Sequence, residues 1–260
     1  MGIGGLTLQW FHQLEEKHAI FHDAVIVDMG PQDLSSGAVG KYPKGTQGKD
    51  LYMQMGCKSY AAFDYSDIRA KYCDFNDPPA GEANADVVTN FGTSEHVFNQ
   101  VGFMRFMHET TRLNGIMLHS LPSAGDRDHG LYNYQPCFFW DLARANNYEI
   151  LHLEYLPHYR LQSVVGCYHG VNLMTNSQFN GLAIFAYPGP LRKAAARVFG
   201  ERRILSMNVV AVASMIRNPK NGFGPLFELY RGGDYLHVAL RKTSSRPFVT
   251  PTQGRFDPGR

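Results

Sequence analysis

The chain has 260 residues, of which 44% are hydrophobic and 18% are charged, and its formal net charge is +2. This composition is typical of a globular protein of one or two domains and excludes a largely disordered chain. The near balance of charge argues against a nucleic acid partner. No apolar run approaches the roughly 18 residues of a membrane span, and the N-terminus lacks the pattern of a secretory signal. We therefore expect a cytoplasmic protein.

The cysteines and the absence of repeats narrow the classes further. No sequence period of 20–50 residues recurs, which argues against solenoids and propellers. None of the cysteines has CxxC spacing, so we expect reduced thiols rather than a zinc site or a disulfide framework. The four cysteines are Cys57, Cys73, Cys137 and Cys167.

Hydrophobic patterns predict strands that alternate with helices over the first 155 residues. The pattern over 6–18 predicts a helix, 24–28 is a short β-branched run typical of a buried strand, and 32–49 is expected to be a long loop. Further along the chain we expect helices over 50–55, 95–113 and 136–146, and strands over 59–64, 68–75, 85–90, 115–120 and 148–155. Such alternation favours an α/β fold with a mostly parallel sheet covered by helices on both faces.

The C-terminal part is harder to interpret. Strands are expected over 180–187 and 235–241, with a helical segment over 191–217 and an irregular tail over 246–260. No linker is evident, so we expect a single domain over 1–260, with a core over 20–155 and an elaborated C-terminal part over 156–260. Polar-aromatic stretches at 155–159 and 168–172 could contribute to an acceptor site.

Acidic or amide residues recur where the predicted strands end. In an open parallel sheet, ligands bind in the crevice outside the carboxyl ends of the strands. Here those ends carry Asp28, Asp64, Asp74 and Asn90. A single acid at such a place often initiates a turn or caps a helix. The whole set favours a ligand that contains a nucleoside.

Several segments, in this order, make the chain resemble the class I S-adenosylmethionine-dependent methyltransferases. They are Val25-Ile26-Val27-Asp28-Met29-Gly30, Ala62-Phe63-Asp64, Tyr72-Cys73-Asp74-Phe75-Asn76, the stretch from Asp86 to Asn99 with its Glu95-His96 pair, and Asn114-Gly115-Ile116-Met117-Leu118-His119. The resemblance covers roughly residues 20–155, and the order is more specific than any one motif. It implies a Rossmann-like domain with a seven-stranded, mostly parallel sheet that binds S-adenosylmethionine.

The resemblance also implies where the cofactor would lie. The methionine part would lie by Asp28 and Gly30, the ribose by Asp64, and the adenine by Asp74 and Phe75. Asn90 and Phe91 would border the sulfonium and its methyl group.

The turn after the first acid departs from the family pattern. A compact Gly-x-Gly-x-Gly turn is expected, but Pro31 and Gln32 follow Gly30. Pro31 removes a backbone donor. Asp28 and Asp64 are 36 residues apart, against roughly 20 between the glycine loop and the ribose acid. The cofactor loop is therefore interpreted as remodelled by an insertion, with the amide of Gln32 replacing a glycine contact. A degenerate pocket in a non-catalytic relative is the alternative.

Methyl transfer to a hydroxyl needs a base, and histidine suits this role because its unperturbed pKa lies near neutrality. His129 lies in the loop that leaves the fifth predicted strand. His96 is expected at a helix start, where the helix dipole would favour the neutral base; a structural role for it is equally open. His119 lies inside a predicted strand, where packing is the simpler role.

The loop after the fifth strand has the composition of a binding loop for a polyhydroxyl acceptor. Its candidate substrate-binding residues are Arg127, Tyr132, Asn133 and Tyr134; the alternative is a surface loop whose aromatic residues pack beneath it. Asp126, Asp128 and His129 could hold Mg²⁺, but their spacing matches no specific metal motif, so this cation is not favoured.

The sequence thus predicts an S-adenosylmethionine-dependent O-methyltransferase acting on a small polar molecule such as a sugar or glycan. The alternatives are a non-catalytic binding or scaffold protein of the same fold and, last, a nicotinamide-dependent oxidoreductase, which lacks its Gly-x-Gly-x-x-Gly motif here. The oligomeric state stays open, a homodimer included.

Overall fold

The computed structural model describes residues 2–35, 42–43, 45–124, 129–156, 158–160, 166–172, 177–181 and 234–252. Contacts divide the chain into two compact units. The first comprises Met1–Leu121, Tyr134–Leu153 and His237–Arg260, and the second comprises Pro122–Asn133 and Glu154–Leu236.

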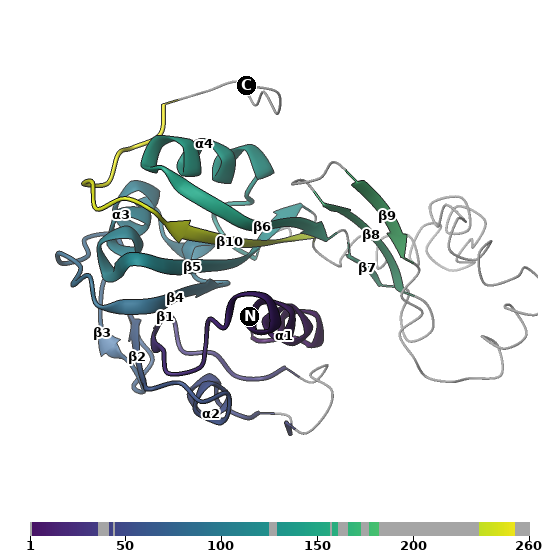
Figure 1. The fold of residues 1–260 in the computed structure, drawn as a ribbon, viewed down its shortest axis with the longest axis horizontal. Coiled ribbons are helices and arrows are strands. Elements are labelled where there is room, and N and C mark those ends of the chain that lie inside the picture. Colours follow the sequence, from purple (N-terminus) through teal and green to yellow (C-terminus); the bar gives the residue numbers. More distant parts are fainter. Residues whose placement is uncertain are drawn as a thin grey trace, which may run out of the picture. The chain divides into compact units, whose positions relative to one another are not determined.

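The first unit is built on a seven-stranded, mostly parallel sheet (Figure 1). Its strand order is β3-β2-β1-β4-β5-β10-β6. The first five strands in this order pair in parallel, and the last strand in the chain runs antiparallel. The strands are β1 (Val25–Met29), β2 (Ser59–Asp64), β3 (Lys71–Tyr72), β4 (Ala85–Phe91), β5 (Thr111–Ala124), β6 (Tyr148–Leu156) and β10 (Asp234–Lys242). The predicted α/β fold class is confirmed.

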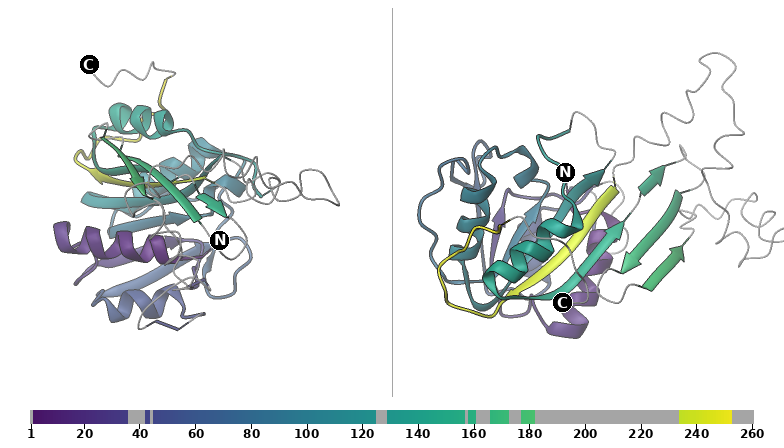
Figure 2. Two further views of the ribbon diagram at one scale, coloured as in Figure 1. Left: turned by 90° about the vertical axis from the view of Figure 1, so that its right-hand side faces the viewer. Right: turned by 90° about the horizontal axis from the view of Figure 1, so that it is seen from above.

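Helices α1 (Gly5–His18) and α2 (Gly48–Gln54) cover one face of this sheet (Figure 2). Alternate residues of β1 and β4, such as Ile26 and Val87, point to this face and join a hydrophobic cluster with both helices. From α1, Trp10 and Phe11 are fully or almost fully buried in this cluster. Burial of this kind stabilises a fold by roughly 2 kcal/mol for each large apolar side chain.

Helices α3 (Gln100–Thr110) and α4 (Pro136–Asn146) lie on the opposite face. Phe106 of α3 packs edge-on against Phe63 of β2, with ring centroids 5.3 Å apart. The last turn of α3 is held by Lys242 of β10, whose buried ammonium donates to the carbonyl oxygens of His108 (2.7 Å) and Thr111 (2.8 Å). A cation at this end of a helix complements the helix dipole.

Most predicted elements of the first 155 residues are confirmed, with small shifts of their ends. The predicted helix over 95–113 is wrong at both ends. Its first residues form a short 3-10 turn, η1 (Ser94–His96), and α3 begins only after Asn99, whose side chain caps the helix by accepting from the Gly102 amide at 2.9 Å. Residues 111–113 already belong to β5.

The predicted third strand, over 68–75, shrinks to the two residues of β3. Ile68 is 99% exposed, so this apolar residue lies on the surface and does not begin a buried strand. In the C-terminal part, β10 confirms the strand expected over 235–241. Residues 182–187 of the other expected strand, and the helix expected over 191–217, lie outside the described residues.

In the second unit, the described backbone forms an antiparallel arrangement around β8 (Gly166–Asn172). This strand pairs with β7 (His158–Arg160), with β9 (Ser177–Gly181) and with the end of β6, where Tyr155 faces Val171. The sequence pattern did not predict strand β8. Among the helices that the structure describes, none is long and apolar enough to span a membrane.

Candidate cofactor site

The turn that follows β1 is shaped around Gly30. This residue has φ +92°, a left-handed conformation that favours glycine, and a Cβ here would lie only 2.6 Å from the hydroxyl oxygen of Thr93. The same Cβ position is 3.6 Å from Oδ2 of Asp64. The turn after β1, the end of β2 and the loop after β4 therefore meet at Gly30, at the carboxyl edge of the sheet where the sequence predicted a ligand.

Asp64 has two oxygens with different roles. Its Oδ1 accepts the backbone amides of Ser66 (2.7 Å) and Asp67 (2.8 Å), which fixes the turn after β2. Its Oδ2 is the atom that faces Gly30. One carboxylate thus holds its own loop with one oxygen and faces Gly30 with the other.

Gln32 lies beside the same turn and is 95% buried, with 5% of its surface exposed. Its Nε2 donates to the Gly30 carbonyl at 3.0 Å, which identifies the other end of the amide as the oxygen. That oxygen, Oε1, is buried without a hydrogen-bond partner. A buried acceptor left unpaired costs roughly 1–3 kcal/mol, so it indicates a place where a donor belongs.

Asp28 lies in the interior at the end of β1 and is fully buried. Tyr60 of β2 donates to its Oδ2 at 2.8 Å, and the Thr89 hydroxyl of β4 donates to its Oδ1. Burial raises the pKa of Asp28 to about 6, against the opposing effect of the hydrogen bonds from Thr89 and Tyr60. The ring of Tyr52 from α2 stacks on Tyr60, with centroids 5.9 Å apart.

The two residues expected at the adenine follow β3. Oδ1 of the half-buried Asp74 accepts the backbone amide of Asn76 at 2.8 Å. Phe75 is buried and packs edge-on against Phe103 of α3, with ring centroids 5.1 Å apart. The structure therefore places Asp74 at a turn and Phe75 beneath it.

At the end of β4, Asn90 is fully buried and is held on the α4 side of the sheet. Its Nδ2 donates to Ser94 Oγ at 2.8 Å and approaches His119 Nδ1 at 3.1 Å, while its Oδ1 accepts the Ser94 amide at 3.1 Å. Phe91 points the other way, into the hydrophobic cluster, where its ring lies 5.5 Å from that of Phe11.

His119 lies inside β5, as the sequence predicted. It is 1% exposed, and burial lowers the pKa of His119 to about 3, so the ring is neutral near pH 7. Because Asn90 donates to Nδ1, the ring proton resides on Nε2. The ring of Phe139 lies 5.0 Å away, which makes His119 part of the packing between β5 and α4.

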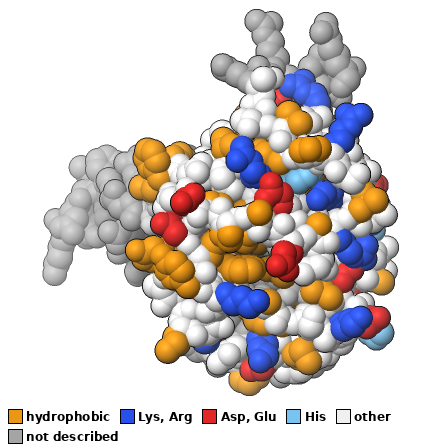
Figure 3. Space-filling model, turned by 90° about the vertical axis from the view of Figure 1, so that its left-hand side faces the viewer, with side chains coloured by type: hydrophobic (Ala, Val, Ile, Leu, Met, Phe, Trp, Pro, Cys, Tyr) orange, Lys and Arg blue, Asp and Glu red, His pale blue; other side chains and the backbone are white. Residues whose placement is uncertain are grey.

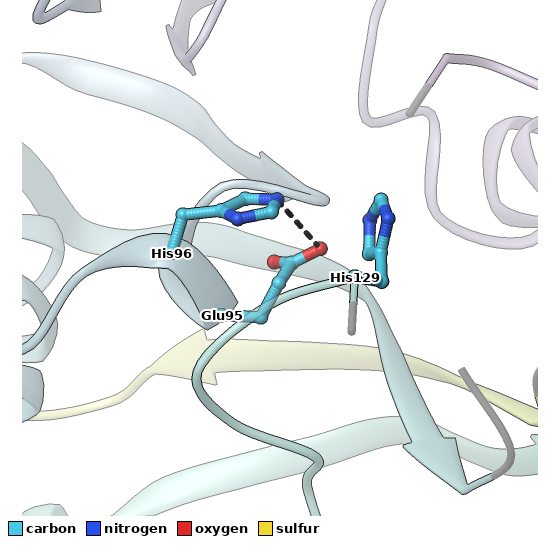
Figure 4. Close-up of side chains that lie close together, drawn as sticks. All are labelled: Glu95, His96 and His129. Carbon is cyan, nitrogen blue, oxygen red and sulfur yellow. Dashed lines mark ion pairs between the residues drawn. The ribbon is translucent and has the colours of Figure 1, made fainter. Parts of the chain in front are cut away.

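Glu95 and His96 form η1, between β4 and α3 (Figure 4). Glu95 is fully buried, whereas 46% of the His96 side chain is exposed. The closest nitrogen and oxygen of the pair, His96 Nε2 and Glu95 Oε1, are 3.9 Å apart. His96 was expected at the start of the next helix, but it closes η1, and the helix cap of α3 is Asn99.

The residues predicted to bind the acceptor fall into three groups. His129 and Asn133 are exposed and Tyr132 is half-buried; all three belong to the second unit. Tyr134 belongs to the first unit and is buried, with its hydroxyl 2.6 Å from Gln100 Oε1 and 2.8 Å from Ser94 Oγ. Asp126, Arg127 and Asp128 lie outside the described residues.

Thr93, Thr89 and Tyr60 were missed in the sequence analysis. The hydroxyl of Thr93 lies where it would clash with a Cβ at position 30, and the hydroxyls of Thr89 and Tyr60 donate to Asp28. The pairing of the strands explains why these hydroxyls lie near Asp28. Asp28 of β1 is paired with Thr89 of β4, and Tyr60 of β2 is paired with Ile26, two residues before Asp28 on the same face of the sheet.

No protein-family model and no curated protein matches the chain. Solved structures do match. A suspected methyltransferase from Bacillus halodurans is 12% identical, over 90% of this chain and 98% of that chain, with a TM-score of 0.47. An S-adenosylmethionine-dependent methyltransferase from Mesorhizobium loti is 11% identical, over 89% and 96%, with a TM-score of 0.37. The 1,6-didemethyltoxoflavin-N1-methyltransferase of Burkholderia thailandensis, solved with S-adenosylhomocysteine, is 14% identical, over 90% and 76%, with a TM-score of 0.35.

Identities and TM-scores this low do not establish a family. The strand order of the first unit, with its antiparallel last strand, is nevertheless typical of class I methyltransferases. The fold is therefore methyltransferase-like, and the residues of the site have to carry any functional conclusion.

Proposed function

We propose that the chain is an S-adenosylmethionine-dependent O-methyltransferase that acts on a small polar acceptor, with a sugar hydroxyl as the favoured class. The observation that carries this proposal is the arrangement at Gly30. A glycine that admits no side chain lies between a carboxylate oxygen of Asp64 and the buried amide of Gln32, whose oxygen has no partner. A close backbone approach beside two acceptors is what a nucleoside with an amino-acid end requires.

The residues around Gly30 support the proposal for the ribose and the methionine end, and the other parts of the cofactor follow from the resemblance. Oδ2 of Asp64 would accept from ribose hydroxyls, and Oε1 of Gln32 would accept from the ammonium of the methionine end. Asp28 would lie beneath the methionine part, and Asp74 with Phe75 would border the adenine. Asn90 and Phe91, at the end of β4, would border the sulfonium.

When bound, the cofactor supplies a methyl group that is already electrophilic, so the protein mainly aligns and deprotonates the acceptor. The proposed base is His96 or His129, which would take the hydroxyl proton on a ring nitrogen. For His96, the Glu95 carboxylate at 3.9 Å would stabilise the imidazolium that results. Arg127, Tyr132, Asn133 and Tyr134 are the proposed acceptor-side residues.

The surface of the first unit agrees with a small-molecule acceptor. On the face shown in Figure 3, the described Lys and Arg side chains are interspersed with Asp, Glu and hydrophobic side chains. Binding of nucleic acid typically relies on a clustered basic surface. This face offers none among its described residues.

The test is transfer of a radiolabelled methyl group from S-adenosylmethionine to a panel of sugars, with phenols and amines for comparison. Each reaction is run with and without Mg²⁺, because the cation remains the less favoured option at Asp126, Asp128 and His129. We expect labelled sugar without added cation. Label in amines alone would replace the O-methylation assignment, and label in none, together with no cofactor binding, would favour the non-catalytic scaffold.

Asp64→Asn is the matched negative variant for this screen. The amide keeps an oxygen that can accept from the Ser66 and Asp67 amides, so the turn after β2 is preserved. It removes the charged acceptor that faces Gly30. Glu149→Gln is the control, since its side chain is 52% exposed and pairs with Arg241 on the surface.

A further inference from the structure

Residues 31–47 separate Gly30 from Gly48 in the sequence, and the two ends of this segment are joined. The Gly48 amide donates to the Gln32 carbonyl at 2.6 Å, and the Leu34 amide donates to the Thr46 carbonyl at 2.8 Å. Asp33 and Gln47 form an antiparallel bridge between these two bonds. The chain therefore leaves the turn after β1 and returns to the same place.

The residue that returns is a glycine in a confined position. A Cβ on Gly48 would lie 3.0 Å from the Gln32 carbonyl oxygen, 3.5 Å from Gln32 Cβ and 3.6 Å from Asp28 Oδ2. Gly48 thus lies against both the buried acid and the residue with the unpaired amide oxygen. The contact with the carbonyl is tighter than ordinary van der Waals distance, so a larger side chain would displace Gln32.

The spacing of the acids leads to the same interpretation. Residues 31–47 number 17, and without them Asp28 and Asp64 would be 19 residues apart rather than 36. That corrected spacing is close to the roughly 20 residues between a glycine loop and its ribose acid. Residues 31–47 therefore interrupt the glycine turn in the sequence, but the backbone bond between Gly48 and Gln32 brings its two parts together in the structure.

We propose that Gly30 and Gly48 together form a split cofactor turn, in which the buried Gln32 amide oxygen binds the ammonium of the methionine end. This inference rests on the proposed function and extends it, because it adds Gly48 to the part of the site that holds the amino-acid end of the ligand. Gly48 admits the ligand by having no side chain, and it keeps Gln32 in place through the 2.6 Å backbone bond.

The experiment compares two ligands on the purified 260-residue chain by calorimetry. S-adenosylhomocysteine carries the amino-acid end, whereas 5′-methylthioadenosine carries the same nucleoside without it. The variants are Gln32→Leu and Gly48→Ala, and Gly4→Ala is the control because its nearest contact would be at an ordinary 3.7 Å. We expect both test variants to weaken S-adenosylhomocysteine binding at least tenfold and 5′-methylthioadenosine binding less than twofold.

The thermal midpoint is measured on the same samples. Gln32→Leu removes both the unpaired buried acceptor and the bond from Nε2 to the Gly30 carbonyl. These two changes have opposite effects on stability, so we expect the midpoint to change little while the affinity falls. Equal losses for both ligands, or no loss in Gln32→Leu, would overturn the split turn while leaving the proposed function in place. Failure of the wild-type protein to bind either ligand would instead overturn the proposed function, and the split turn with it.

Discussion

The polar groups at the end of β1 and those at the end of β4 are arranged in opposite ways. Around Gly30, acceptors are left open, since Gln32 Oε1 has no partner and Asp64 Oδ2 faces the glycine. Around Asn90, the side chains of Asn90 and Tyr134 both bond to Ser94 inside the protein, and no acceptor of Asn90 is left open, although the donor Nε2 of His119 has no partner. Buried polar groups that satisfy one another rigidify a scaffold. Open buried acceptors mark where a ligand supplies the missing donor.

The largest expected effect tests whether an exposed histidine, His96 or His129, is the base, in contrast to the buried His119 beside Asn90. His96→Ala or His129→Ala, whichever removes the base, should lower kcat by about 10²–10⁴-fold, the usual contribution of a general base. Affinity for S-adenosylhomocysteine should stay within twofold, because neither residue belongs to the Gly30 turn. Steady-state rates with the sugar identified in the screen measure this, and an unchanged rate in both variants would remove histidine from the mechanism.

The next prediction compares the Asn90 region and the Gly30 region by the loss of stability when a polar side chain is removed from each. Asn90→Ala should lower the free energy of unfolding by about 2–4 kcal/mol, because it leaves the Ser94 amide and His119 Nδ1 unpaired in the interior. Gln32→Leu should change it by no more than about 1 kcal/mol. Urea unfolding of the two variants measures both. Equal losses would show that the two regions do not differ in the way described.

A smaller effect concerns the acid under the split turn. The pKa of Asp28 is raised to about 6 when folded, above the ordinary value near 3.9 when unfolded. The folded state therefore binds this proton more tightly, and the contribution of Asp28 to stability falls as the pH rises from about 4 to about 6, then stays level. Asp28→Asn removes this loss.

The difference in unfolding free energy between Asp28→Asn and the wild type should therefore shift in favour of the variant by about 1 kcal/mol from pH 5 to pH 7.5. Urea unfolding at the two pH values measures it, with Glu149→Gln as the surface control. A shift in the opposite direction would mean that Asp28 is charged and stabilised in the folded protein.

The smallest effect concerns a surface clamp between the turns after β1 and β2. Arg69 binds Asp33 and Asp67, each at 2.7 Å, and the Asp67 amide in turn binds Asp64. Arg69→Gln should cost less than about 1 kcal/mol of stability, as is usual for surface ion pairs. It should weaken S-adenosylhomocysteine binding about threefold at low salt, and less at high salt. Arg241→Gln, which breaks the pair with Glu149, is the control.

The sequence predicted the sheet well, because strands such as β1 and β2 are short, mostly apolar runs with an acid at or next to their last residue. It also placed Asp28, Gly30, Gln32 and Asp64 in one region, and the structure brings them together. The closure at Gly48 could not be predicted, because it depends on backbone hydrogen bonds across a 17-residue segment and not on a residue pattern.

Other differences have local causes. The Asn99 cap divides the helix predicted over 95–113, although the apolar spacing of that segment is continuous. Strand β8 has no clear alternation of apolar and polar residues, so periodicity gave no signal for it. The burial of Asp28 depends on Tyr60 and Tyr52, which lie on other elements.

The most direct measurement is calorimetric titration of S-adenosylhomocysteine into the wild-type protein, Asp64→Asn and Glu149→Gln. We expect micromolar binding by the wild type and by Glu149→Gln, about −8 kcal/mol, and at least a tenfold loss in Asp64→Asn. Absence of binding up to millimolar ligand, or equal binding by Asp64→Asn, would contradict a cofactor site at the Gly30 turn.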